Sequence, residues 1–282
     1  MNKGAVRLII LMDNRVPQAS PLRAEHGFSA WVETPAGAAL LDVGRSALWA
    51  CNAEKLNVPV ESCAALVLSH GHYDHTGGLV AEEALPAGLD LIAHPDAFTE
   101  KHASLPGGES RYIGPPLSVT QLSERGYQLR LTVDPVEVLP GVWTTGEVPR
   151  THGAASTEPR LCVRQGEAFV PDELLDDCSL LLDTPRGWVV LTGCAHSGLT
   201  NVLHRAREVA KTDRLHAVIG GTHLVRADGP QVQEAIDCLR TFQTELIAPC
   251  HCTGPGAKRL LAAEFGERFV DTGVGTTFTF EC

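Results

Sequence analysis

The sequence has little positive charge, no long apolar run and no internal repeat. Its 23 Lys and Arg stand against 34 Asp and Glu, a net charge of −11, which disfavours a protein that binds nucleic acid through clustered cations. No stretch approaches the roughly twenty apolar residues of a membrane-spanning helix. A composition of 44% hydrophobic and 20% charged residues is that of a globular protein and excludes intrinsic disorder.

The cysteines lack the dense, regular spacing of secreted disulfide scaffolds. Nine of them, an odd number, are scattered over the 282 residues. The apolar run at 8–12 is too short for a signal peptide and indicates a first β-strand instead. We therefore expect free thiols in a reducing, cytoplasmic environment.

Short strand-like runs alternate with helical patterns along the chain. Runs at 28–33 and 38–42, joined by Thr-Pro-Ala-Gly, predict a hairpin, and 64–69 reads as a buried strand. Helices are expected at 199–211, 231–243 and 257–265, each following a strand, which indicates a layered α/β fold. We expect one domain over residues 1–282, with a Gly/Pro-rich insertion or lid at about 105–159.

The clearest chemical signal is a histidine-rich loop after the strand at 64–69. Residues 69–78 read Ser-His-Gly-His-Tyr-Asp-His-Thr-Gly-Gly, with glycines that let the backbone turn tightly. Imidazole and carboxylate are common metal ligands, so His70 and His72 can reach one cation while Asp74 and His75 reach a second. A solvated loop that binds metal adventitiously is the less favoured interpretation.

This loop resembles the His-x-His-x-Asp-His signature of the metallo-β-lactamase superfamily. The resemblance implies an αβ/βα sandwich, two mixed β-sheets flanked by helices, with a one- or two-metal site at one edge. It extends to a branch often called dihydropteroate-synthase-like, through motifs along nearly the whole chain: 13–14, 24–27, 146–150, 192–198, 220–224 and 251–254. That branch name implies a transferase, whereas most of the superfamily are hydrolases.

The remaining ligands are expected at strand ends in the second half of the chain. His196 and His251 are the favoured candidates. Cys194 stands where many superfamily members have a bridging aspartate, so either its thiolate takes part or His196 supplies the ligand. His152 ranks below His196 as a mid-chain ligand. Cys250 and Cys252 alternate around His251, so in an extended segment they point away from it and we expect them to pack.

Other residues are predicted to support the site rather than to bind metal. Asp42, in Leu-Asp-Val-Gly, can accept the ring N–H of a ligating histidine, or can simply belong to a turn. Glu25 and His26 form a turn that can orient substrate, or a surface turn. His223 is either a ligand or a residue that contacts substrate or donates a proton to the leaving group, and Asp74 is a ligand first and a proton shuttle second.

These residues predict a metallohydrolase acting on a small ester, phosphoester or lactone. Two divalent cations, zinc before manganese or iron, would lower the pKa of a shared water toward about 7. The alternative is a metal-assisted transferase that joins a pterin diphosphate to ribofuranosylaminobenzene phosphate. A non-catalytic metal sensor is the least favoured reading. The expected partner is a small molecule, phosphorylated or not, rather than nucleic acid or membrane.

Overall fold

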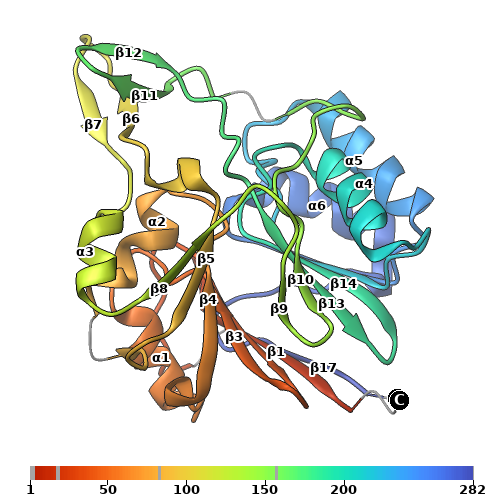
Figure 1. Cartoon of the computed structure of the whole chain (residues 1–282). Coiled ribbons are helices and arrows are strands. Elements are labelled where there is room, and N and C mark those ends of the chain that lie inside the picture. The colour runs from red at the N-terminus through yellow and green to blue at the C-terminus, as the bar shows by residue number, and fades with distance from the viewer. Residues whose placement is uncertain (1–3, 17–19, 82–83, 156–157, 282) are drawn as a thin grey trace.

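Two large β-sheets face each other and carry helices on their outer sides. The computed structural model describes residues 4–16, 20–81, 84–155 and 158–281. Figure 1 shows the two sheets meeting in the middle of the molecule, with α1, α2 and α3 outside one and α4, α5 and α6 outside the other. The layers therefore run helix, sheet, sheet, helix, and the predicted α/β class with two mixed sheets flanked by helices is confirmed.

The first sheet has seven strands, and its parallel strands lead into the histidine-rich loop. Strands β3, β4, β5 and β8 run parallel to one another, whereas β17, β1, β2 and β3 pair antiparallel. In spatial order the strands are β17 (Thr277–Phe280), β1 (Val6–Met12), β2 (Ser29–Thr34), β3 (Gly37–Leu41), β4 (Cys63–Val67), β5 (Asp90–Ala93) and β8 (Gln128–Leu131).

The second sheet has six strands, three of which are parallel neighbours. These are β14, β15 and β16, so their carboxyl ends meet at one edge. In spatial order the strands are β16 (Leu246–Cys250), β15 (Ala217–Gly221), β14 (Gly187–Thr192), β13 (Ser179–Thr184), β10 (Val142–Thr144) and β9 (Glu137–Leu139).

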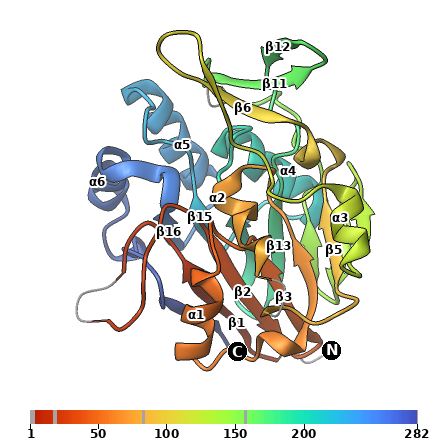
Figure 2. The ribbon, with the colours of Figure 1, turned by 90° about the vertical axis from the view of Figure 1, so that its left-hand side faces the viewer.

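A small third sheet projects beyond the ends of the sandwich in both views (Figures 1 and 2). Its order is β12 (Ala168–Pro171), β11 (Leu161–Gln165), β6 (Lys101–Ser104) and β7 (Ser110–Tyr112). The Gly/Pro-rich segment at 105–159 therefore contributes β7 to this sheet, β8 to the first large sheet, and β9 and β10 to the second. Residues 156 and 157 of that segment lie outside the described residues, and the single-domain organisation stays a prediction.

Apolar side chains fill three layers. Inward-facing residues of both large sheets, among them Leu41 and Leu191, form the central layer. Trp31 and Trp49 pack between the first sheet and its helices, and Val202 and Leu239 between the second sheet and its helices. The helices are α1 (Leu48–Lys55), α2 (Tyr73–Thr76), α3 (Val119–Glu124), α4 (Leu199–Ala210), α5 (Gly229–Thr241) and α6 (Gly254–Phe265).

The predicted elements lie close to the observed ones. The hairpin is β2 and β3, paired from Ala30–Leu41 to Thr34–Gly37. The three expected helices are α4, α5 and α6, and α5 begins two residues earlier than expected because Asp228 accepts a hydrogen bond from the Gln231 backbone and caps it. Among the described residues, no helix is both long and apolar enough to cross a membrane.

Candidate metal centre

The histidine-rich loop is held tightly where it leaves β4. His70 and His75 are fully buried, and His72 and Asp74 nearly so. A Cβ on Gly71 would lie 1.9 Å from the carbonyl oxygen of Ala97, so a side chain has no room there. This glycine is thus required by close backbone packing, which differs from the turning role expected from the sequence, since its φ is not among the positive values.

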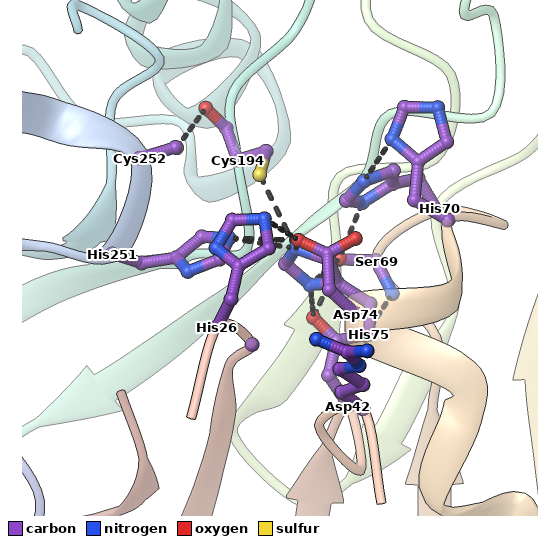
Figure 3. A network of polar contacts seen from close by, with 12 residues as sticks. His26, Asp42, Ser69, His70, Asp74, His75, Cys194, His251 and Cys252 are labelled. Atoms are coloured by element: carbon purple, nitrogen blue, oxygen red, sulfur yellow. Dashed lines mark hydrogen bonds and ion pairs between the residues drawn. The ribbon is translucent and has the colours of Figure 1, made fainter. Parts of the chain in front are cut away.

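The second sheet delivers the other candidate ligands at the carboxyl ends of its three parallel strands. Cys194 and His196 follow β14, His223 follows β15 and His251 follows β16. The strands β14, β15 and β16 are hydrogen-bonded neighbours, so their end loops converge on the histidine-rich loop that follows β4. Figure 3 shows Cys194 and His251 pointing toward Asp74 and His75 from the opposite side of the site.

Four groups of potential ligands form within the described residues, each with its ligand atoms within 4.8 Å of one another. Cys194 belongs to three of them. The groups are His70–Cys194–His196, His75–Cys194–His251, Cys194–His223–Cys252 and His26–Asp74–His251. The candidate ligands at 70, 74, 75, 196 and 251 all belong to these groups, with the Cys194 sulfur between the two histidine sets. His72 belongs to none of the four, but its ring lies against that of His196, with centroids 5.0 Å apart.

The donor set fits a bound cation. His75 Nε2 lies 3.1 Å from His251 Nε2 and 3.2 Å from Cys194 Sγ. His72 Nε2 is buried and has no hydrogen-bond partner among the residues that the structure describes. Burial lowers the pKa of His72 to about 3, despite the opposing effect of Asp74, so its imidazole is neutral and keeps a lone pair to donate.

Two further imidazoles are kept neutral in the same way. Burial, together with neighbouring histidines, holds the pKa of His70 and of His196 well below the ordinary value. Their rings lie 4.8 Å apart between centroids. Neutral imidazoles gathered in this way are the form of histidine that binds a cation.

Asp42 orients His75 by contacting the ring nitrogen that faces away from the ligand groups. It is fully buried, and its Oδ2 lies 2.6 Å from His75 Nδ1. Its two oxygens also accept hydrogen bonds from the Ser69 backbone N–H at 2.7 Å and the Ser69 hydroxyl at 2.6 Å. Burial alone would lower the pKa of His75, but Asp42 and Asp74 outweigh it and raise the pKa to about 9. The Nδ1–H donates to Asp42, and Nε2 faces His251 and Cys194, so a cation bound there would displace the second ring proton from Nε2.

Asp74 lies between His251, a member of the ligand groups, and the more exposed His26. Its Oδ2 lies 3.1 Å from His26 Nε2 and 3.4 Å from His251 Nε2. Burial would raise the pKa of Asp74, but His75 and His251 lower it well below the usual range. Half of the His26 side chain is exposed, and its ring stacks on that of His251. His26 is therefore placed where a substrate can reach it.

The carboxylate of Glu25 is engaged elsewhere. Its oxygens accept hydrogen bonds from the Arg45 and Ser46 backbone N–H groups, at 3.2 and 2.9 Å, and from the Ser46 hydroxyl at 2.8 Å. The side chain thus fixes the turn that follows Asp42. Its predicted contact with substrate stays a prediction.

His223 lies between His196 and an acidic side chain. Its ring centroid is 4.2 Å from that of His196, and its Nε2 is 3.6 Å from a carboxylate oxygen of Glu158. Burial would lower the pKa of His223, but Cys252 and Glu158 raise it to about 10, so both ring nitrogens are protonated at neutral pH and the ring is positively charged. A protonated imidazole beside the ligand groups can donate that proton.

Cys252 faces the site, which corrects the expectation that it packs away from it. The alternation argument assumed an extended chain, whereas residues His251–Thr253 form a 3₁₀ helix and His251 has a φ of 48°. The turn brings the sulfur of Cys252 within hydrogen-bonding distance of the Cys194 carbonyl oxygen and the backbone N–H of His223. Cys250 remains fully buried in the core.

His152 lies apart from these groups. It is exposed, its Nδ1 contacts the Thr151 hydroxyl at 2.9 Å, and its ring stacks on His204 with centroids 3.8 Å apart. Cys194 and His196, rather than His152, stand beside His70.

A buried acidic pair positions both halves of the site, and the sequence analysis missed it. Asp176 Oδ2 accepts the Gly71 N–H at 2.8 Å, and its Oδ1 pairs with the Lys101 ammonium at 3.0 Å. Asp177 accepts the Ser197 N–H at 2.9 Å, next to His196. Two consecutive aspartates directly before a buried strand were the available signal, whereas nothing in the sequence around Lys101 marks it.

Four site residues adopt left-handed backbone conformations, which favour glycine. They are Asp42, Ala195, His223 and His251, with φ between 48° and 58°. Each is held by its surroundings: the His251 N–H, for example, donates to Asp13 at 2.7 Å. Strained non-glycine residues of this kind tend to gather at functional sites.

Comparisons with known proteins agree with this geometry. Residues 22–251 match the family model of the metallo-beta-lactamase superfamily. The chain is 28% identical, over 99% of both chains, to the 7,8-dihydropterin-6-methyl-4-(beta-D-ribofuranosyl)-aminobenzene-5'-phosphate synthase of Methanocaldococcus jannaschii. It is 33% identical, over 87% of its own length and 90% of the other, to an uncharacterised protein of the same archaeon.

A solved structure extends the likeness to three dimensions. A crystal structure described as a metal-dependent hydrolase of the beta-lactamase superfamily superposes with a TM-score of 0.82 at 25% identity, covering 97% of this chain and 98% of the other. Together with the buried His, Cys and Asp groups, the likeness supports a metal-dependent enzyme. On the matched family model, the related sequences and this superposition, the chain belongs to the metallo-β-lactamase superfamily.

Proposed function

We propose that the chain is a metallohydrolase that cleaves a small ester, phosphoester or lactone. The observation that carries the proposal is the position of Cys194, which is shared by the groups His70–Cys194–His196 and His75–Cys194–His251. Two sets of ligands that meet at one atom suit a pair of cations acting on one substrate oxygen. The similarity to a metal-dependent hydrolase at a TM-score of 0.82 supports this choice.

The residues around the ligands have distinct tasks in this proposal. Divalent cations, zinc first because of the Cys194 sulfur, would supply a water of lowered pKa and polarise the substrate oxygen under attack. Asp42 holds the Nδ1 proton of His75 and so fixes the ring. His26, half exposed and paired with Asp74, can contact the substrate. His223 carries a proton at neutral pH and can give it to the leaving group.

The test is hydrolysis of generic substrates by the protein loaded with zinc, manganese or iron. We expect release of nitrophenol from bis-p-nitrophenyl phosphate or p-nitrophenyl acetate, loss of activity and of bound metal in His70→Ala and His251→Ala, and near-normal activity in His152→Ala. His152 is the matched control because its ring stacks on His204 outside the ligand groups. Unchanged activity in a metal-depleted His70→Ala protein would refute every metal-dependent reading.

The second candidate is a metal-assisted transferase, favoured by the synthase of M. jannaschii, which aligns over 99% of both chains. In that case the cations would assist departure of diphosphate from a pterin, and ribofuranosylaminobenzene phosphate would be the acceptor. Turnover that requires both compounds, with no cleavage of generic esters, would select this candidate over the hydrolase. Under either candidate the proposed partner is a small molecule.

A further inference from the structure

Two thiols meet beside the ligand groups, and the proposed hydrolysis uses just one of them. The ligand atoms of Cys194, His223 and Cys252 all lie within 4.8 Å of one another, so the two sulfurs are no farther apart than that. The Cys252 sulfur is 3.5 Å from the Cys194 carbonyl oxygen and accepts a hydrogen bond from the backbone N–H of His223 at 3.2 Å. Figure 3 shows the two residues side by side at one rim of the site.

A glycine at the end of the strand between them leaves room for the Cys252 sulfur. Cys194 follows β14 and Cys252 follows β16, with the end of β15 in between. Strand β15 ends in Gly220 and Gly221, and a Cβ on Gly221 would lie 2.7 Å from Cys252 Sγ. Because this glycine has no side chain, the Cys252 sulfur can lie against the end of β15.

The two sulfurs differ in access and in surroundings. Cys194 is buried among the imidazoles, 3.2 Å from His75 Nε2, whereas Cys252 is a residue of intermediate exposure whose sulfur lies inside a largely buried ligand group. The other buried thiols, such as Cys178, lie outside the ligand groups. Because Cys252 is the more exposed residue of the two, we assign it the reaction with a small oxidant and Cys194 the resolving step.

We propose that Cys194 and Cys252 are a redox-active pair that a peroxide converts to a disulfide when no metal is bound. The bond would withdraw the Cys194 sulfur from the two histidine groups that share it and so block metal loading. A bound cation would keep Cys194 engaged and protect the pair. The proposal concerns the thiols themselves and holds whichever substrate the enzyme takes.

The chemistry balances with hydrogen peroxide as the oxidant. The Cys252 thiolate attacks one peroxide oxygen, the O–O bond breaks, and a sulfenic acid and hydroxide result, the hydroxide being protonated to water. The Cys194 thiolate then attacks the Cys252 sulfur, forming the S–S bond and releasing hydroxide, which is protonated to a second water. The two sulfurs together lose two electrons, and the peroxide gains them. A dithiol reductant reverses the reaction.

The test compares chelator-treated and zinc-loaded protein in a Cys51→Ser background, which removes an exposed thiol. After one equivalent of hydrogen peroxide we expect the metal-free protein to lose two thiols. A non-reducing peptide map should join the peptides that contain Cys194 and Cys252. Zinc binding should be lost with the thiols and return after reduction by dithiothreitol, while Cys178 stays reduced as the internal control.

Several results would overturn the proposal. One is a peptide map without the 194–252 link although thiols are consumed. Another is equal cross-linking in zinc-loaded and metal-free protein, and a third is normal zinc uptake by the cross-linked chain. Cys252→Ser should abolish the link, and if that variant does not fold, the map of the parent chain decides alone. Because the readout is covalent, an absence of esterase activity would count against the proposed function and leave this result intact.

Discussion

Replacing Asp42 with asparagine should weaken metal binding about 10- to 100-fold, the usual effect of losing a residue that orients a ligating histidine. The Asp42 carboxylate is fully buried and accepts from three donors: the Ser69 N–H, the Ser69 hydroxyl and His75 Nδ1. Asparagine replaces one acceptor oxygen with an NH₂ donor. Wherever that donor points it meets another donor, and if it faces His75 the ring proton moves to Nε2, which then has no lone pair for a cation.

The expected loss corresponds to about 1.4 to 2.7 kcal/mol of binding free energy. Competition between the protein and a chromophoric chelator for zinc measures it directly. Asn52→Ala is the matched control, because Asn52 is also fully buried and makes three hydrogen bonds, yet they go to Leu11 and Arg23 rather than to a histidine. Equal zinc affinity in Asp42→Asn and the parent chain, with both folded, would refute the orienting role.

Further predictions concern the parts that hold the site in place. Lys101→Met leaves Asp172 and Asp176 buried without their cation, so the free energy of unfolding in urea should fall by about 3–5 kcal/mol. Arg7→Gln, which breaks an exposed ion pair with Glu33, should cost less than about 1 kcal/mol, and equal effects would contradict the argument. Burial would lower the pKa of Lys101, but the two aspartates raise it above 10.5. The contribution of Lys101 to the free energy of unfolding should therefore be complete at neutral pH and decline only as the pH rises past that value. A decline already near pH 8 would contradict this. Gly71→Ala forces a Cβ to within 1.9 Å of a backbone carbonyl and should reduce zinc affinity; unchanged affinity would show that the loop relaxes.

Contiguous patterns in the sequence predicted the fold and most of the residues that form the ligand groups. A buried strand followed by a dense His/Asp loop places its ligands by chain geometry alone, and the later candidates follow strands whose ends share one edge of a sheet. The resemblance to the metallo-β-lactamase superfamily is confirmed. The individual ligand roles stay predictions, because they depend on a cation.

Contacts between distant residues could not be predicted in this way. Asp176 holds Gly71 across 105 positions and Lys101 across 75, and no local pattern encodes such pairs. Cys252 was misplaced because period-two alternation fails where the chain leaves β16 and turns into a 3₁₀ helix. The hydrogen bonds of the Glu25 carboxylate to Ser46 also join distant parts of the chain and are not encoded by its local motif, while its role toward substrate stays a prediction. Local sequence patterns predict individual helices and strands, whereas the hydrogen bonds and ion pairs that hold the site connect residues of different elements.

The left-handed residues around the metal groups have a consequence for engineering the protein. Each non-glycine residue in that conformation costs roughly 1 kcal/mol or more, and four of them surround the site. Ala195→Gly, for instance, would relieve that cost at a position next to Cys194 and His196. Selection for thermostable variants would therefore favour substitutions in these loops, and the same substitutions would loosen the geometry of the candidate ligands. Thermal robustness is better sought on α1 and α3, which carry none of the candidate ligands.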